Sequence, residues 1–110
     1  MKTLKIIAAA ALYDTMTERI ENLCKAIENE HNCNAKHAGS VFVTVMDGLL
    51  KVWEGSIEVF LLEGHREATI CYGWREFDGQ EVKYVTVLEI PPVNSPESAV
   101  RAAIARATKK

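Results

Sequence analysis

Two Asp-Gly pairs constrain the fold of this chain more than any other feature. Asp47-Gly48 follows the run "SVFVTVM", and Asp78-Gly79 follows the run "ICYGWREF"; both runs are rich in β-branched and aromatic residues. An Asp-Gly pair after such a run is a strong signal for a two-residue hairpin turn. The sequence therefore predicts two β-hairpins in the middle of the chain.

The strands around these turns are short and follow one another closely. The predicted strands cover Ser40–Met46, Leu49–Trp53, Ile57–Leu62, Ala68–Phe77 and Val82–Ile90. Consecutive strands joined by short turns usually pair with their neighbours in the chain. We therefore expect an antiparallel β meander of four to five strands.

Apolar residues near the N-terminus recur every three or four positions, which is the spacing of a helix with one apolar stripe. The stripe comprises Leu4, Ile7, Ala8, Ala11, Leu12, Met16, Ile20, Leu23, Cys24 and Ile27. The segment "TMTE" resembles a capping box, which leaves two alternatives: one helix over residues 3–31, or a lead-in followed by a helix from Thr15. We favour the long helix because the stripe keeps its phase through Thr15. Asparagines and a glycine in residues 29–39 then end it.

A second helix is predicted at the C-terminus. Pro91-Pro92 ends the last strand, Ser95 is placed to cap the helix, and Pro96 suits its first position. Its apolar stripe comprises Val100, Ala103, Ile104 and Ala107. The expected fold class is α+β, with an N-terminal helix, the meander and a C-terminal helix, and with both helices packed on one sheet face.

Composition excludes several classes of protein. The chain has 110 residues, of which 48% are hydrophobic and 25% charged, so we expect one domain over residues 1–110. The net charge of −2 provides no positive field to attract nucleic acid or an anionic membrane. No stretch approaches the roughly 20 apolar residues of a membrane-spanning helix. The first residues resemble an export signal, but their apolar run is short and Asp14 follows it, so we do not expect export.

Cysteine usage indicates a reducing compartment. Cys24, Cys33 and Cys71 form an odd set without a Cys-x-x-Cys pair, which is typical of reduced thiols in a cytoplasm. Cys24 and Cys33, with His31 and His37, offer zinc ligands, but their spacing matches no familiar zinc pattern and Cys24 belongs to the helical stripe. We therefore predict no metal site and no cofactor. Cys71 has no base nearby in sequence and is expected to be a buried apolar residue.

The middle of the chain gathers the side chains that suit a small-molecule pocket best. These candidate ligand-binding residues are Trp53, His65, Arg66, Tyr72 and Trp74. We favour the other interpretation, in which the aromatic rings fill the core and His65 and Arg66 belong to a turn. The acidic neighbours Glu54, Glu58, Glu63 and Glu67 would repel phosphate, which argues against nucleic acid. No catalytic motif is present in the sequence, so no catalytic residue is assigned.

Residues 52–104 are similar to a pattern found in small uncharacterised bacterial proteins, some of which are carried on integron gene cassettes. The matching segments are "VWEGSIEVF", "GHREA", "CYGW" and "PPVNSPESAV", against Val-Trp-x-Gly-x-Val-Glu-Val-Phe, Gly-His-Pro-x-Ala, Tyr-Ala-Trp and Pro-Val-x-Ser-Pro. The chain departs from the pattern at Arg66, where the pattern has proline, and at Gly73, where it has alanine. The resemblance implies a stand-alone bacterial cytoplasmic protein and transfers no functional residue.

The N-terminal stripe is longer than one small sheet can cover. The segment Leu4–Leu12 should overhang the sheet, and overhanging apolar surface usually marks a contact with a partner. We therefore expect a non-enzymatic homodimeric interaction or binding protein that pairs through its N-terminal helix. The alternative is a small-molecule binder or enzyme with a pocket between sheet and helices, and nucleic-acid binding is a weaker alternative.

Overall fold

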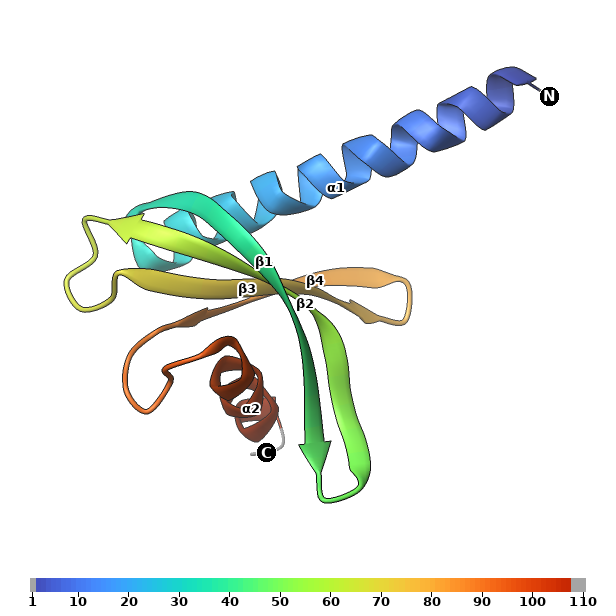
Figure 1. Ribbon diagram of the computed structural model, residues 1–110. Coiled ribbons are helices and arrows are strands. Elements are labelled where there is room, and N and C mark those ends of the chain that lie inside the picture. Colours follow the sequence, from blue (N-terminus) through green and yellow to red (C-terminus); the bar gives the residue numbers. More distant parts are fainter. Residues whose placement is uncertain (1, 108–110) are drawn as a thin grey trace.

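The chain folds into a helix, four antiparallel strands and a second helix, which confirms the α+β class. The computed structural model describes the backbone of residues 2–107 and the side chains of residues 17–77 and 79–107. In chain order the elements are α1 (Lys2–His31), β1 (Asn34–Asp47), β2 (Leu50–Glu63), β3 (Ile70–Asp78), β4 (Glu81–Leu88) and α2 (Pro96–Ala107) (Figure 1). Among the described residues, no helix is both long and apolar enough to cross a membrane.

Both predicted hairpin turns are confirmed. The sheet order is β1-β2-β3-β4, and every neighbouring pair is antiparallel. Asp47 pairs with Leu50 at the first turn, and Asp78 pairs with Glu81 at the second. The turn glycines Gly48 and Gly79 have φ angles of 64° and 66°, a left-handed conformation that glycine adopts without steric cost.

The four strands form two hairpins that share only a short waist. β2 pairs with β3 at four positions, Glu58–Leu61 against Ile70–Gly73, whereas each hairpin is paired along its own length. Beyond this waist the hairpins diverge as two arms (Figure 1). α2 contacts β1, β2 and β4, so it packs against both hairpins.

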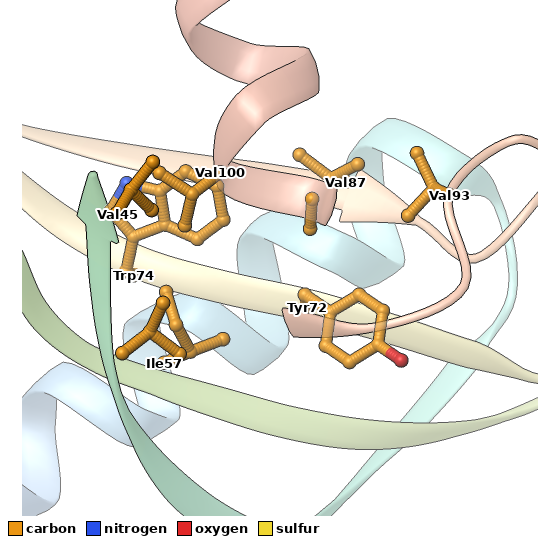
Figure 2. Close-up of a cluster of buried hydrophobic side chains, with 9 residues drawn as sticks. Val45, Ile57, Tyr72, Trp74, Val87, Val93 and Val100 are labelled. Atoms are coloured by element: carbon orange, nitrogen blue, oxygen red, sulfur yellow. The ribbon is translucent and has the colours of Figure 1, made fainter. Parts of the chain in front are cut away.

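The expectation that both helices pack on one face of the sheet is wrong. Leu23 and Ile27 of α1 pack with Phe60 on one face, in a cluster that also holds Leu62, Ala68 and Cys71. Val100 of α2 packs with Trp74 on the other face, in a cluster that also holds Val43, Val45, Ile57, Tyr72, Val87, Val93 and Ala99 (Figure 2). The physical reason is that the central strands are apolar at consecutive positions. Because successive side chains of a strand point to opposite faces, both faces need cover.

The first strand starts earlier than predicted, and two predicted strands are one. β1 begins at Asn34 rather than at Ser40 because residues 34–39 pair with the end of β2 despite their low β propensity. The predicted strands Leu49–Trp53 and Ile57–Leu62 merge into β2, since the residues between them pair with β1 as well. The sheet therefore has four strands.

The helix predictions are confirmed at three points. α1 is continuous from Lys2 to His31, so the long-helix alternative is correct. Asn32 follows it with a φ of 52°, the left-handed conformation common just after a helix. Ser95 caps α2, because its hydroxyl oxygen accepts the backbone N–H of Ser98 at 3.1 Å.

Candidate functional site

Three of the predicted ligand-binding residues lie together on the α2 face. Trp74 is 1% exposed, and its ring meets that of Trp53 edge-on, with centroids 5.8 Å apart. The indole N–H of Trp74 donates to Glu76 at 2.9 Å, and the hydroxyl of Tyr72 donates to Glu89. Burial, followed by that contact with Glu89, raises the pKa of Tyr72. The polar atoms of Trp74 and Tyr72 thus have hydrogen-bond partners within the protein.

His65 and Arg66 lie elsewhere, in the loop between β2 and β3. They line a cleft of about 430 Å³ beside His31 and Asn32, at the end of α1. His65 Nδ1 accepts the backbone N–H groups of residues 67 and 68 at 3.1 and 2.9 Å, so in the neutral ring the proton is on Nε2. The structure therefore does not bring His65 and Arg66 to the tryptophan pair. Ligand binding by the five predicted residues stays a prediction.

The cysteine and histidine side chains near the end of α1 contact different residues and do not converge on one point. The Cys24 thiol donates to the carbonyl of Ala35 at 3.2 Å, and His31 Nε2 lies 3.0 Å from the hydroxyl of Thr86. Within the described part of the chain, no three His, Cys, Asp or Glu side chains are arranged to hold a metal. Burial raises the pKa of Cys71 to about 12, which keeps that thiol protonated at neutral pH.

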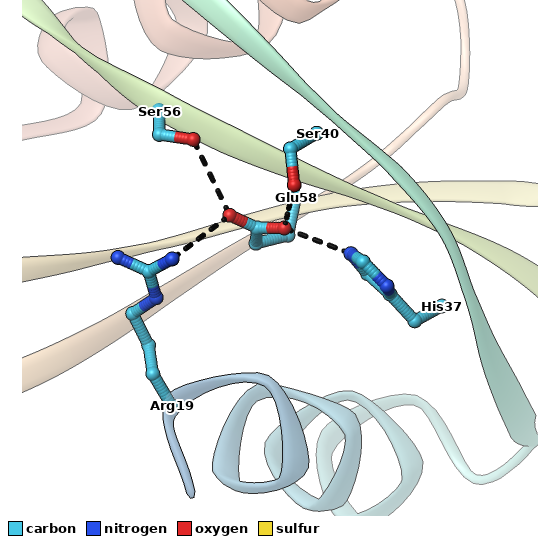
Figure 3. A network of polar contacts seen from close by, with 5 residues as sticks. All are labelled: Arg19, His37, Ser40, Ser56 and Glu58. Carbon is cyan, nitrogen blue, oxygen red and sulfur yellow. Dashed lines mark hydrogen bonds and ion pairs between the residues drawn. The ribbon is translucent and has the colours of Figure 1, made fainter. Parts of the chain in front are cut away.

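Sequence reasoning missed a buried polar cluster that we call the Glu58 clamp. Glu58 on β2 is 1% exposed, and Figure 3 shows four side chains converging on its carboxylate. One oxygen lies 2.8 Å from His37 Nε2 and accepts the Ser40 hydroxyl at 2.5 Å. The other accepts the Arg19 guanidinium at 3.4 Å and the Ser56 hydroxyl at 3.3 Å. The clamp thus joins α1, β1 and β2.

A buried carboxylate is costly to desolvate unless charged and hydrogen-bonding partners surround it. Here the partners are supplied by three elements, so the carboxylate is stable only when α1 is seated on the sheet. The Arg19 Nε–H is buried and has no hydrogen-bond partner among the described residues. The cleft beside His65 is not lined by any clamp residue. The geometry therefore favours holding α1 in place over acid–base chemistry.

The clamp lies where α1 leaves the sheet. Arg19 is the α1 residue in the clamp, and the helix continues N-terminally from there, away from the strands (Figure 1). On the same sheet face the two arms expose apolar side chains: Phe42 is 67% exposed, Phe77 66% and Val82 45%. Phe42 lies on this face because it pairs with Ser56, which points to the same side of β2 as Glu58. Phe77 lies on it because every second residue back along β3 leads to Cys71, which packs against α1. Projecting helix and exposed rings thus share one side of the molecule.

A second cleft, of about 340 Å³, runs beside β4. Its apolar lining comes from the two strands of the second hairpin and from α2, through Trp74, Val85, Val100, Ala103, Ile104 and Ala107. Its polar lining is Glu30, Glu76, Lys83, Tyr84, Thr86 and Arg106. No family model, no curated protein and no solved structure matches the chain.

Proposed function

We propose that this protein is a small non-enzymatic binding protein that works as a homodimer joined through the N-terminal half of α1. The proposal depends on one observation: the N-terminal half of α1 projects away from the sheet (Figure 1). Among residues 2–107, no strand and no second helix lies alongside the N-terminal half of α1 in this view. A single helix without tertiary contacts is marginally stable in water, so such a segment gains its stability from a partner.

The apolar stripe of the sequence falls on this projecting half. The stripe residues Leu4, Ile7, Ala8, Ala11 and Leu12 lie in it, although their side chains are outside the described residues. Residues 2–16 form a helix about 22 Å long, enough to present several turns of the stripe. Alanines in the stripe would allow two helix backbones to approach closely. The exposed Phe42 and Phe77 on the same sheet face supply further apolar surface for a partner helix.

Charge favours a second copy of this chain as the partner. In the sequence the part of the stripe in this projecting half begins beside Lys2 and Lys5 and ends near Asp14 and Glu18. Two such helices in antiparallel contact would place the lysines of one copy near the acids of the other. A parallel arrangement would bring like charges together. We therefore infer an antiparallel helix pair about a two-fold axis.

The thiols and the resemblance support a proposal for the compartment. Three free cysteines occur in the structure, and the resemblance implies a bacterial cytoplasmic protein. We propose that the protein acts in the cytoplasm, as a stand-alone product of the bacterial mobile-element type.

The test is the mass in solution of two isomeric double variants, measured by sedimentation velocity at tens of micromolar. Ala8→Glu with Ala11→Glu puts two charges into the stripe, whereas Ala9→Glu with Ala10→Glu puts the same two charges on the opposite side of the helix. The unmodified protein and the Ala9/Ala10 variant should sediment at twice the 12.3 kDa chain mass, and the Ala8/Ala11 variant as a monomer. A monomeric unmodified protein, or equal behaviour of the two variants, would contradict the proposal.

A further inference from the structure

The two edges of the sheet differ in how well they are protected. β1 carries a register shift between His37 and Gly39, and such a bulge disrupts pairing with another strand. β4 pairs with β3 alone, and its register is unbroken from Glu81 to Leu88, with no bulge and no proline. Its outer backbone groups therefore form a regular template for one more strand.

The 340 Å³ cleft follows this open edge on both faces of the sheet. On the α2 face it is lined by Val85 and by Val100 and Ile104 of the helix, which together make an apolar pocket. On the α1 face it is lined by Thr86 and by Glu30. A strand laid along β4 would point its side chains alternately toward these two linings. The cleft thus offers side-chain contacts to an added strand on both faces of the sheet.

The cleft is lined by two carboxylates, which are hydrogen-bonded within the protein, and by two basic side chains. Glu76 accepts the indole N–H of Trp74, and Glu30 accepts the Thr86 hydroxyl at 3.3 Å. Across the described residues, the side chains of Lys83 and Arg106 make no hydrogen bond and no ion pair. Lys83 and Val85 are two positions apart on β4, so they face the same side. An added strand would therefore lie beside a basic side chain and an apolar side chain that are two residues apart on β4.

We propose that the β4 edge and the adjoining cleft bind an extended segment of a partner protein by strand addition. The main chain of the segment pairs with the outer edge of β4. One apolar side chain of the segment lies beside Val85 and enters the pocket at Ile104. An acidic side chain, two residues away, lies beside Lys83 and Arg106. Main-chain pairing supplies affinity in this mode of recognition, and the alternate side chains supply specificity.

The test uses two fluorescent, end-blocked peptides of about seven residues, the length that spans β4. In both peptides threonine alternates with one aspartate and two valines. The aspartate precedes the valines in one peptide and follows them in the other, because an added strand can pair with β4 in either direction. Fluorescence anisotropy should show saturable binding of one of them to the folded protein. Amide shifts in NMR spectra should then map to residues 82–88 and to α2.

Three controls decide between strand addition and other modes of binding. N-methylation of alternate peptide amides removes half the main-chain donors, so it should weaken binding at least about tenfold, or about 1.4 kcal/mol. Lys83→Glu with Arg106→Glu should weaken it similarly, and Lys36→Glu on the β1 edge should leave it unchanged. Circular dichroism confirms that each variant is folded. Absence of binding for both peptides at about 1 mM, or equal binding of the N-methylated peptide, would overturn the proposal.

The Ala8→Glu/Ala11→Glu variant separates this site from the helix interface. Strand addition at β4 uses the second hairpin, α2 and Glu30 near the C-terminal end of α1, and no residue of the projecting half of α1. The variant should therefore bind the peptide as the unmodified protein does. Loss of binding in this variant would place the peptide at the α1 surface and would contradict the assignment to β4.

Discussion

Two glutamates on β2 face the same side of the sheet in very different surroundings. Glu54 is exposed and pairs with the exposed Lys51 at 3.1 Å, whereas Glu58 is buried in the clamp. Removing one partner from a buried ionic cluster leaves the others unsatisfied. We expect Glu58→Ala to lower the free energy of unfolding in urea by about 3 kcal/mol. Glu54→Ala is the matched control and should change it by less than about 0.5 kcal/mol. Equal effects would show that the clamp does not hold α1.

His31 should make stability depend on pH. Burial lowers its pKa below the ordinary value of 6.5, and neighbouring His65 lowers it further, while Glu30 opposes both. Because the folded chain binds a proton less readily than the unfolded chain, stability is lost as the pH falls through 6.5. His31→Gln should therefore show a smaller drop in melting temperature between about pH 7.5 and pH 5.5. A steeper drop in the variant would reverse the sign argued here.

The sequence predicted the surroundings of single residues better than it predicted which residues contact one another. The burial of Cys71 and Trp74, the Ser95 cap and the turn glycines follow from local pattern and are confirmed. The Glu58 clamp does not follow from local pattern, because Arg19 and Glu58 are 39 positions apart in the sequence and come together only when α1 packs on the sheet. The available signal was a single acidic residue inside the apolar run "SIEVF".

At the scale of elements, an aromatic pair contacts across the diverging hairpins. Trp53 on β2 and Trp74 on β3 meet where the two strands are no longer paired with each other. A Cβ at Gly55 would lie 2.8 Å from the Trp53 ring, so glycine makes room for that ring. We expect Gly55→Ala to displace Trp53, to change the near-ultraviolet circular dichroism, and to cost about 1–2 kcal/mol. Gly39→Ala on β1 is the control, since nothing lies within 4 Å of its Cβ position.

Element order and type were predictable, and the sides on which the helices pack were not. Hairpin turns and α1 continuity depend on local sequence and followed from it, whereas the start of β1 and the merging of two predicted strands into β2 did not. Assigning a helix to a face requires knowing which alternate residues of β3 meet which helix. Ile70, Cys71 and Tyr72 are all apolar and fit either side. Only the packed structure decides between them.

At the scale of the whole molecule, the packed body uses only part of α1. The α1 side chains in the described core are Leu23 and Ile27, with Ile20 and Cys24 beside them. A chain that begins at Thr15 would keep all of these, and its "TMTE" segment could cap the shortened helix. We expect this truncated chain to fold with a similar melting temperature at low concentration and to sediment as a monomer. Unfolding of the truncated chain would show that the projecting half supports the fold itself.

The short waist between the hairpins has a consequence for engineering. Leu49 at the tip of the first hairpin is 101% exposed, and the strand pairs around it contribute nothing to the waist. The chain between Gly48 and Leu49 is therefore a tolerant insertion point. A reporter peptide or a small fused domain placed there would leave both cores intact, and it would provide a handle for tethering the protein without touching either proposed interface.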